Sequence, residues 1–310
     1  MPKKQMPTTS SCCTDVDRLL DEAAHLATSA LMREVMLTPK PGLVDMYTNG
    51  AHTDMNVSTF LRSIQALEPH FKAYIHLGFA YANADNLKDR NFISQLRAIG
   101  RVAETDMFKA TGGINTHKGA NYSFSLILAA TGIELAAGAT LPFDSSESER
   151  ILICTSKLGQ EILNEDFGGL KLYQSSSEDL SHGEQLFLEK GVTGIRGESA
   201  AGYPLVANVL LPYLRKSSHN DSEDTLLRAM VLLMATLEDT NLLHRGGLEG
   251  LAWVKEQAQQ LWKKNPPHDD LIWILSRLDR AFTERNLSPG GTADLLSLGI
   301  YFASLENVIH

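Results

Sequence analysis

Apolar residues recur at helical spacing along nearly the whole chain, and this periodicity constrains the fold more than any other feature. In residues 15–36 one face carries Leu19, Ala23 and Leu26, and Thr14 is placed as an N-cap. The best strand candidate, "ILIC" at 151–154, is too short to outweigh the helical register around it. The pattern predicts an all-α fold of about ten helices. The other stripes are residues 58–82, 92–108, 117–137, 148–165, 200–214, 223–238, 248–262, 269–282 and 292–305.

One domain is expected to contain all of these helices. The most turn-rich connections, residues 139–148 and 215–223, are polar, but neither is flanked by a change in composition. No segment of roughly 20–50 residues repeats. We therefore predict a single helical domain over residues 14–310. A disordered lead-in over residues 1–13, without the apolar core of a secretory signal, is expected to precede it.

Charge and hydropathy argue against two classes of partner. The net charge of −9 disfavours unspecific binding to nucleic acid, whose backbone is anionic. The hydrophobic share of 43% is that of a globular protein, and no run reaches the roughly eighteen apolar residues of a membrane-spanning helix. The three cysteines are scattered, as expected in a reducing cytoplasm. An acidic protein that binds anions must gather its cations locally.

Five polar stretches interrupt the helical pattern, and each adjoins a predicted helix. Glycine between helices ordinarily serves as a C-cap or turn, which would explain any one of them. Together they also carry cations and carboxylates that a turn does not need, and this favours a functional site. The stretches are "TPKPGLVDMYTNGAHTD" (38–54), "ETDMFKATGGINTHKG" (104–119), "GVTGIRGESAAGYP" (191–204), "EDTNLLHRGGLEG" (238–250) and "ERNLSPGGTADLL" (284–296).

Three glycine pairs precede helical stripes and predict phosphate-binding turns. Helix N-termini present unpaired N–H groups, and glycine lets an anion approach the backbone closely. Because Lys118 is followed by Gly119 and no strand precedes it, the pattern is not a P-loop. We expect the pairs and the nearby cations to bind the phosphates of a nucleotide. The pairs are Gly112–Gly113, Gly246–Gly247 and Gly290–Gly291, and the cations are Lys40, Lys118, Arg196 and Arg245.

Carboxylates in the same stretches indicate a divalent cation. Mg²⁺ takes a few carboxylates together with water and substrate phosphates. Asp239, followed by Thr240 and Asn241, offers three oxygen-bearing side chains at a helix end. Asp45 and Asp294 are the other predicted ligands, although Asp294 is equally well explained as a first-turn acid that complements the helix dipole. The residues thus predict a helical, Mg²⁺-dependent enzyme that acts on a polyphosphate nucleotide.

The polar stretches resemble those of the triphosphoribosyl-dephospho-CoA synthase family. The matching segments are "TPKPGLVD", "DMFKATGGINTHKG", "GIRGESAAGYP", "DTNLLHRGG" and "RNLSPGGTADLL". They occur in family order and span about residues 30–300, and the combination of "NTHKG" with "NLSPGGTADLL" is long and specific. Two positions depart from the family pattern: Met46 stands where many relatives have Arg, and Ser199 stands where Ala is common. The first departure removes one expected phosphate contact.

The resemblance implies a glycosyl transfer. The family joins ATP to 3′-dephospho-CoA through the ribose 2′-hydroxyl and expels adenine. The product is the precursor of the prosthetic group of citrate lyase or malonate decarboxylase, and a second transferase passes it to an acyl carrier protein. The oligomeric state stays open, with a homodimer among the options.

The resemblance also implies roles for the candidate residues. Lys118 and the Gly112–Gly113 turn would hold the triphosphate. The segment Asn115, Thr116 and His117 would position ribose or base, with His117 donating to adenine or to a phosphate. An oxocarbenium-like transition state needs one carboxylate to stabilise it and another to deprotonate the attacking hydroxyl. The candidates, unranked by the sequence, are Glu104, Asp106 and Glu198.

Two functions of other classes fit the same residues. A helical Mg²⁺-dependent phosphohydrolase would use the acids to cleave the triphosphate, and a CoA-binding scaffold would turn nothing over. The products formed from ATP distinguish the three alternatives: adenine, ADP or AMP, or none.

Overall fold

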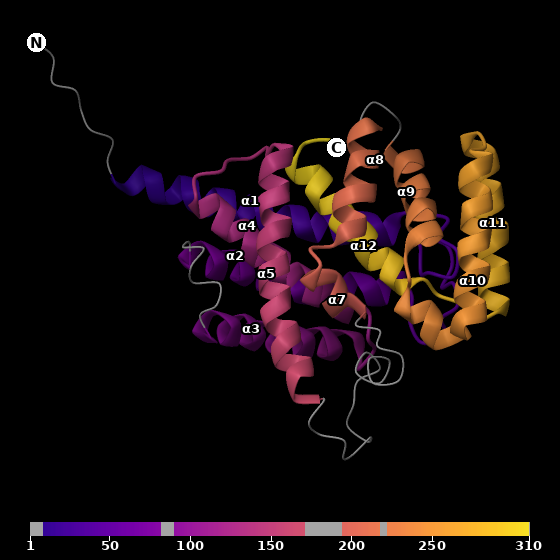
Figure 1. Ribbon diagram of the computed structural model, residues 1–310, viewed down its shortest axis with the longest axis horizontal. Coiled ribbons are helices and arrows are strands. Elements are labelled where there is room, and N and C mark those ends of the chain that lie inside the picture. Colours follow the sequence, from indigo (N-terminus) through magenta and orange to yellow (C-terminus); the bar gives the residue numbers. More distant parts are fainter. Residues whose placement is uncertain (1–8, 82–89, 171–193, 218–221, 310) are drawn as a thin grey trace, which may run out of the picture.

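Eleven α-helices and no strand make up the part of the chain that the structure, a computed structural model, describes (Figure 1). This part comprises residues 9–81, 90–170, 194–217 and 222–309, and within it the prediction of an all-α, single-domain fold is confirmed. The helices are α1 (Thr9–Met36), α2 (Val57–Ala80), α3 (Arg90–Thr111), α4 (Lys118–Ala136), α5 (Ser145–Leu170), α7 (Gly194–Ala200), α8 (Leu211–Lys216), α9 (Ser222–Thr236), α10 (Thr240–Lys264), α11 (His268–Glu284) and α12 (Gly290–Leu305).

The helix expected over residues 200–214 is wrong, because the backbone leaves the helical region there. Gly202 and Tyr203 have positive φ values of 77° and 50°, so α7 ends at Ala200. A π-helical turn over Val206–Leu210 then leads into α8. The Gly-Tyr-Pro sequence inside this apolar stripe marks the break, since glycine tolerates a positive φ that side chains disfavour.

Two predicted boundaries also shift. α1 begins at Thr9 rather than at Thr14, inside the lead-in expected over residues 1–13. The connection expected over residues 139–148 is shorter, because α5 already begins at Ser145. Part of the connection expected over 215–223 lies outside the described residues. Periodicity reports which residues face the core, and it says less about where the last turn ends.

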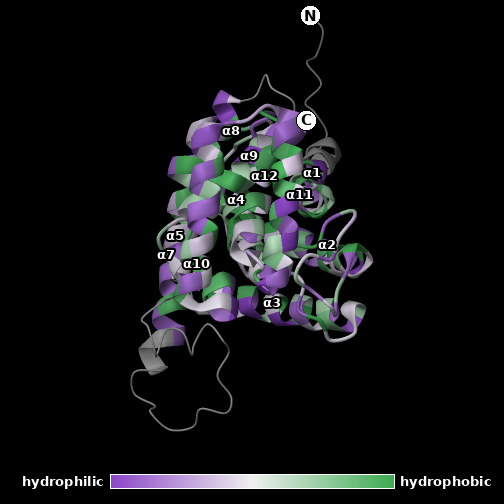
Figure 2. Cartoon of the chain, turned by 90° about the vertical axis from the view of Figure 1, so that its right-hand side faces the viewer, coloured by the Kyte–Doolittle hydropathy of each residue, from purple (hydrophilic) through white to green (hydrophobic). Residues whose placement is uncertain are grey.

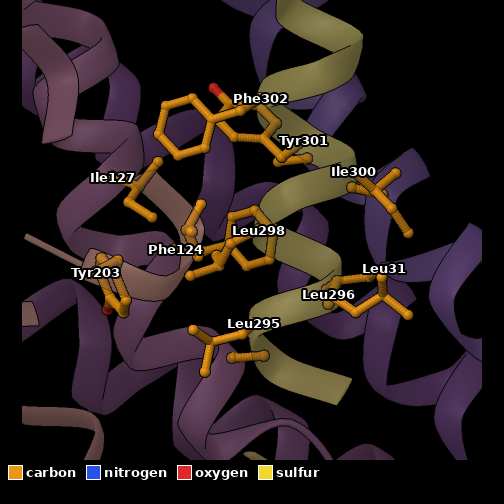
Figure 3. Packing of buried hydrophobic residues seen from close by; sticks show 14 of the residues in the cluster. Leu31, Phe124, Ile127, Tyr203, Leu295, Leu296, Leu298, Ile300, Tyr301 and Phe302 are labelled. Carbon is orange, nitrogen blue, oxygen red and sulfur yellow. The ribbon is translucent and has the colours of Figure 1, made fainter. Parts of the chain in front are cut away.

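α4 and α12 form the centre of the molecule. Buried residues make up 14 of the 19 positions of α4 and surround the helix, as expected of one that is covered on all sides. In Figure 3, Leu298 of α12 lies beside Phe124 of α4, whereas Leu296 points toward Leu31 of α1. α12 is therefore held between α1 and α4, and its first turn is fixed relative to both.

α2 and α4 are packed unusually closely. A Cβ added to Gly78 would lie 1.9 Å from the Ala129 carbonyl oxygen, and one added to Gly132 would lie 2.1 Å from the Ile75 carbonyl oxygen. The two glycines thus let each helix touch the backbone of the other. This contact fixes the second half of α4 against the last turns of α2.

Hydropathy follows the layers of the fold. In Figure 2 the hydrophobic residues gather on the inner helices, and hydrophilic residues lie on the outward sides of the surrounding ones. Among the described helices, none is both long and apolar enough to cross a bilayer.

Candidate active site

The first turn of α4 meets the first turn of α12, and a carboxylate joins them. A Cβ on Gly119 would lie 2.2 Å from Asp294 Oδ2. The Ala120 N–H donates to the same carboxylate, which thereby satisfies one of the N–H groups left unpaired at the start of a helix. Burial, together with the nearby carboxylates of Glu34 and Asp239, raises the pKa of Asp294 well above its usual range. Asp294 therefore faces α4, and the residue is only partly exposed.

Asp239 links the starts of α10 and α12. Its Oδ1 accepts the N–H groups of Asn241 and Leu242 at 2.9 and 3.3 Å. Its Oδ2 accepts the Thr292 N–H at 2.8 Å and the Thr292 hydroxyl at 3.2 Å. A Cβ on Gly291 would lie 3.1 Å from this carboxylate. The N-terminal site of α12, where the glycine pair is expected to hold a phosphate, thus holds a carboxylate of the protein.

Asp45 organises the loop that connects α1 to α2. Its Oδ2 accepts from the Lys40 N–H at 3.0 Å and the Thr38 hydroxyl at 2.9 Å. Its Oδ1 accepts the N–H groups of Tyr47 and Thr48 at 2.8 and 2.9 Å. Both oxygens of Asp45 have protein donors, which favours a structural role for a carboxylate predicted to bind metal.

A buried ion pair lies beneath the same loop. Lys40 is 1% exposed, and its Nζ donates to Glu34 Oε1 at 2.5 Å and to the Glu34 carbonyl oxygen at 2.6 Å. Burial raises the pKa of Glu34, and Lys40 opposes this shift. The pair lies near other members of the site, because Glu34 acts on Asp294 and Lys40 acts on His117 electrostatically. Lys40 is thus a buried cation with a carboxylate partner of its own.

His117 lies just before α4 with its ring in the interior. Its Nδ1 is 2.7 Å from Ser63 Oγ on α2, and the Thr116 hydroxyl donates to the same oxygen at 2.7 Å. Its Nε2 is buried without a hydrogen-bond partner among the described residues. Burial and the positive charge of Lys40 lower the pKa of His117 to about 3. The ring is therefore neutral near pH 7.

Lys118 and Glu104 form a half-exposed ion pair, with Nζ and Oε1 2.7 Å apart. The Gly112–Gly113 pair ends α3 and does not start α4, since the Gly113 N–H donates to the Phe108 carbonyl oxygen five residues back. Its positive φ values of 72° and 89° require glycine. A Cβ at either glycine would meet nothing within 4 Å, so the backbone stays accessible to a ligand.

Short contacts also surround Asn115 and the other glycine pairs. Asn115 is exposed, and its Oδ1 accepts the N–H of the first α4 residue at 3.3 Å. Gly247, with φ 62° and ψ −164°, interrupts α10, and a Cβ on Gly246 would lie 2.4 Å from Leu287 Cδ2. Arg245 donates to the Ala51 carbonyl oxygen at 3.1 Å. Through these contacts α10 touches both the loop before α12 and the loop before α2. A Cβ on Gly290 would meet the Asn241 amide at 2.6 Å.

Arg196 and Glu198 lie on the short helix α7. Arg196 Nε donates to Asp166 Oδ2 at 2.8 Å, and its guanidinium lies 5.7 Å from the centre of the Tyr122 ring. Glu198 Oε2 is buried without a hydrogen-bond partner among the described residues, and burial raises the pKa of this carboxyl. Tyr203, which follows α7, lies within electrostatic reach of both Glu198 and Asp294.

Asp106 faces another side of α3. It is 47% exposed and accepts a bond from His70 Nε2 at 2.8 Å. None of its described contacts is with another predicted site residue. A cavity of about 700 Å³ between α8, α9 and the end of α10 is lined by Tyr213, Arg228 and Trp262 among others, and by none of the predicted site residues.

The structure thus brings Lys40, His117, Asp239 and Asp294 together, with Lys118, Glu104 and Glu198 on adjoining elements. No cluster of three or more His, Cys, Asp or Glu residues suited to a metal ion occurs within the described residues. Sequence reasoning missed Glu34 and Ser63. Both lie within amphipathic helices, where a polar residue is normally expected on the solvent-facing side. Glu34 differs from the other described acids of α1 only in that it is buried, and the sequence gives no signal of this.

The fold and site define a helical protein whose buried acids, lysine and histidine surround the first turns of two helices. The model of the ATP:dephospho-CoA triphosphoribosyl transferase family, CitG, matches residues 20–309. The chain therefore belongs to this family, which confirms the resemblance, and it is an enzyme of the transferase class with ATP and dephospho-CoA as its substrates.

Curated relatives agree over almost the full length. A probable 2-(5″-triphosphoribosyl)-3′-dephosphocoenzyme-A synthase of Streptococcus equi subsp. equi is 44% identical over 296 residues, 94% of this chain and 98% of the relative. A protein of the same name from Streptococcus pyogenes serotype M18 is 42% identical over 297 residues, 94% and 99% of the two chains. No solved structure matches.

Proposed function

We propose that this protein transfers the 5-triphosphoribosyl group of ATP to the 2′-hydroxyl of 3′-dephospho-CoA and releases adenine. Family membership supports the pair of substrates. The observation that carries the proposal is the convergence of the five polar stretches on the starts of α4 and α12. Lys40, His117, Tyr203, Asp239 and Asp294 each come from a different stretch and are linked by the contacts described above.

Glu198 is our candidate for the general base. Its buried, unpartnered Oε2 can accept a proton, and its raised pKa brings it closer to the range in which a carboxylate removes a proton effectively. Glu104, which forms an ion pair with Lys118, is our candidate to stabilise an oxocarbenium-like centre. The contact of Asp106 with His70 makes it the weakest of the three candidates.

The phosphates of ATP require cations beside an accessible backbone. Lys118 is half-exposed, and the open Gly112–Gly113 turn precedes it. We propose that these groups bind the triphosphate and that Arg196 contributes from α7. Arg245 is a weaker candidate for binding the triphosphate, because its guanidinium already donates to the Ala51 carbonyl oxygen in the loop before α2. Asn115, exposed at the same turn, is suited to the ribose hydroxyls.

We propose that Mg²⁺ accompanies the triphosphate. Two of the three predicted ligands, Asp45 and Asp239, have protein donors on both carboxylate oxygens. Asp294 fits better, because its charge is opposed by neighbouring carboxylates and a cation would relieve that repulsion. Asp294, with Glu34 beside it, would hold the ion together with phosphate oxygens. Bound there, Mg²⁺ would neutralise charge on the triphosphate.

The products of the reaction test the proposal. ATP labelled in its γ-phosphate is incubated with 3′-dephospho-CoA, and the mixture is separated by chromatography. We expect free adenine and one larger product that retains the label. CoA is the matched control, and it should be a poor acceptor because its 3′-phosphate crowds the attacking hydroxyl. ADP, AMP or pyrophosphate in place of adenine would establish the phosphohydrolase alternative, and no turnover would establish a binding scaffold.

The stereochemistry distinguishes the two routes of transfer. Direct attack opposite the departing adenine inverts the anomeric carbon and gives an α-linked riboside. We expect this outcome because a site that binds both substrates together needs no covalent intermediate. A retained β-linkage would require a covalent ribosyl-enzyme on a carboxylate. The anomeric proton coupling of the product decides between them.

We propose that the enzyme works in the cytoplasm and serves a carrier-protein pathway. Its product is suited to a second transferase that loads the acyl carrier protein of citrate lyase or malonate decarboxylase. A pull-down with each carrier-protein transferase tests this partner. Sedimentation of the purified chain tests a homodimer.

A further inference from the structure

A chain of three polar groups leads from the start of α4 into the interior. The Thr116 hydroxyl donates to Ser63 Oγ, and Ser63 Oγ lies 2.7 Å from His117 Nδ1. Ser63 has no exposed surface, and His117 is 3% exposed. No hydrogen bond caps α4 from the His117 side chain, so the ring is not needed to start the helix.

The protons along this chain fix the tautomer of the ring. Each hydroxyl has one proton to donate. Because Thr116 donates its proton to Ser63, Ser63 retains its own proton for His117 Nδ1. Nδ1 is then the acceptor, and a neutral imidazole must carry its proton on Nε2.

The Nε2–H that results is a buried donor without an acceptor among the described residues. Native proteins rarely leave such a group unpaired, and those that do usually have a functional reason. Phe60 packs at right angles to the ring, with centroids 4.9 Å apart, and restricts its rotation. The donor is therefore held in one orientation before any ligand binds.

We propose that Ser63 is a positioning residue that holds His117 as its Nε2–H tautomer, and that His117 donates this hydrogen bond to an acceptor atom of the bound nucleotide. The role in binding rests on the proposed triphosphoribosyl transfer, whereas the tautomer does not. A neutral donor stabilises its acceptor without giving up the proton. The proton that adenine takes on leaving must then come from another group or from water.

Nitrogen NMR of the full-length protein, labelled with ¹⁵N only in histidine, tests the tautomer. The His117 signals are assigned by their loss in His117→Gln. We expect a protonated-type signal from Nε2 and an unprotonated-type signal from Nδ1 near pH 7. In Ser63→Ala this pattern should be lost and replaced by a mixture of tautomers. A protonated Nδ1 in the wild type, or an unchanged pattern in Ser63→Ala, overturns the proposal.

Activity tests the second half. Ser63→Ala should lower kcat/KM by about two- to tenfold, because roughly half to nine-tenths of the population then carries the wrong tautomer. The matched control is Ser125→Ala, another buried serine, whose hydroxyl donates within α4 to the Tyr122 carbonyl oxygen and should not matter. His117→Gln, whose amide reaches the Nε2 position, should retain more activity than His117→Asn, whose amide reaches Nδ1.

Two results separate this inference from the proposed function. Equal losses in His117→Gln and His117→Asn, with folding intact by circular dichroism, would refute the donor role while adenine release by the wild type still stood. Absence of adenine release by the wild type would refute the proposed function, whereas the NMR measurement would still show whether Ser63 fixes the tautomer of His117.

Discussion

The buried neutral histidine predicts that acid destabilises this protein in a defined pH range. His117 has a pKa of about 3 in the native state, and an unfolded chain restores the ordinary value of 6.5. Between these values the unfolded state binds a proton that the native state does not. Stability therefore falls as the pH drops from about 6.5 toward 3, and His117 has no effect above pH 7.

Over most of this pH range only the unfolded state takes up a proton at His117, so the loss of stability depends only on the pKa of the unfolded chain. Each pH unit below 6 removes about 1.4 kcal/mol from the free energy of unfolding, because the native ring stays neutral. Between pH 7 and pH 5 the contribution of His117 sums to about 2 kcal/mol. This is a sizeable share of the roughly 5–15 kcal/mol that stabilises an ordinary domain.

Urea denaturation of the wild type and His117→Gln at pH 7 and pH 5 measures this contribution. Carboxyl groups with raised pKa values, such as Glu34 and Asp294, act in the opposite direction, but they are present in both proteins. The difference between the two proteins should thus change by about 2 kcal/mol in favour of the glutamine variant on going to pH 5. His25→Gln, which removes an exposed ring, is the matched control.

One result would refute the reasoning. If the stability difference between wild type and His117→Gln is the same at both pH values within about 0.5 kcal/mol, the native ring takes up a proton like the unfolded chain. His117 would then be able to act as a proton acid, contrary to its neutral state in the structure.

Four further outcomes are expected. Gly132→Ala should lower the free energy of unfolding by about 3 kcal/mol or more, since its Cβ would lie 2.1 Å from the Ile75 carbonyl oxygen. Gly100→Ala, whose Cβ has its nearest contact at 3.7 Å, should raise the free energy of unfolding by about 0.5–1 kcal/mol. Urea denaturation measures both variants, and equal effects would contradict the close packing of α2 and α4. Asp239→Ala should cost about 2–4 kcal/mol in the same assay, because it leaves N–H groups of two helices unpaired; a loss below about 0.5 kcal/mol would argue against the link. Lys118→Ala should raise the KM for ATP with an unchanged circular dichroism spectrum, and a large drop in Tm would instead indicate a structural role. Excess EDTA should abolish turnover and added Mg²⁺ should restore it, so full activity in EDTA would exclude a metal requirement.

Much of the fold was predictable because helix formation leaves a local signature. Repeats of apolar residues at helical spacing report burial along a single segment, and they located most helices to within a few residues. The exception at residues 200–214 has a local cause, the glycine and proline within an apolar stripe. Family membership was predictable for a similar reason, since the polar stretches are contiguous motifs.

The arrangement of the site depended on contacts that no local pattern encodes. Asp239 and Asp294 read alike in the sequence, each an acid near a terminus of a predicted helix. In the structure Asp239 receives the N–H groups of α10 and α12, whereas Asp294 reaches across to α4. Which helix starts meet is decided by the packing of helices whose contacting residues lie far apart in the sequence.

The sequence by itself determined the helical class, most helix positions, the family and the set of loops that carry polar residues. Tertiary structure alone decided which of those residues share a site, which carboxylates already have donors, and that Glu34 and Ser63 belong with them. The physical reason is burial. A charge or hydroxyl changes its pKa, its partners and its role when water is removed from it, and a sequence does not state where water is excluded until distant helices are packed together.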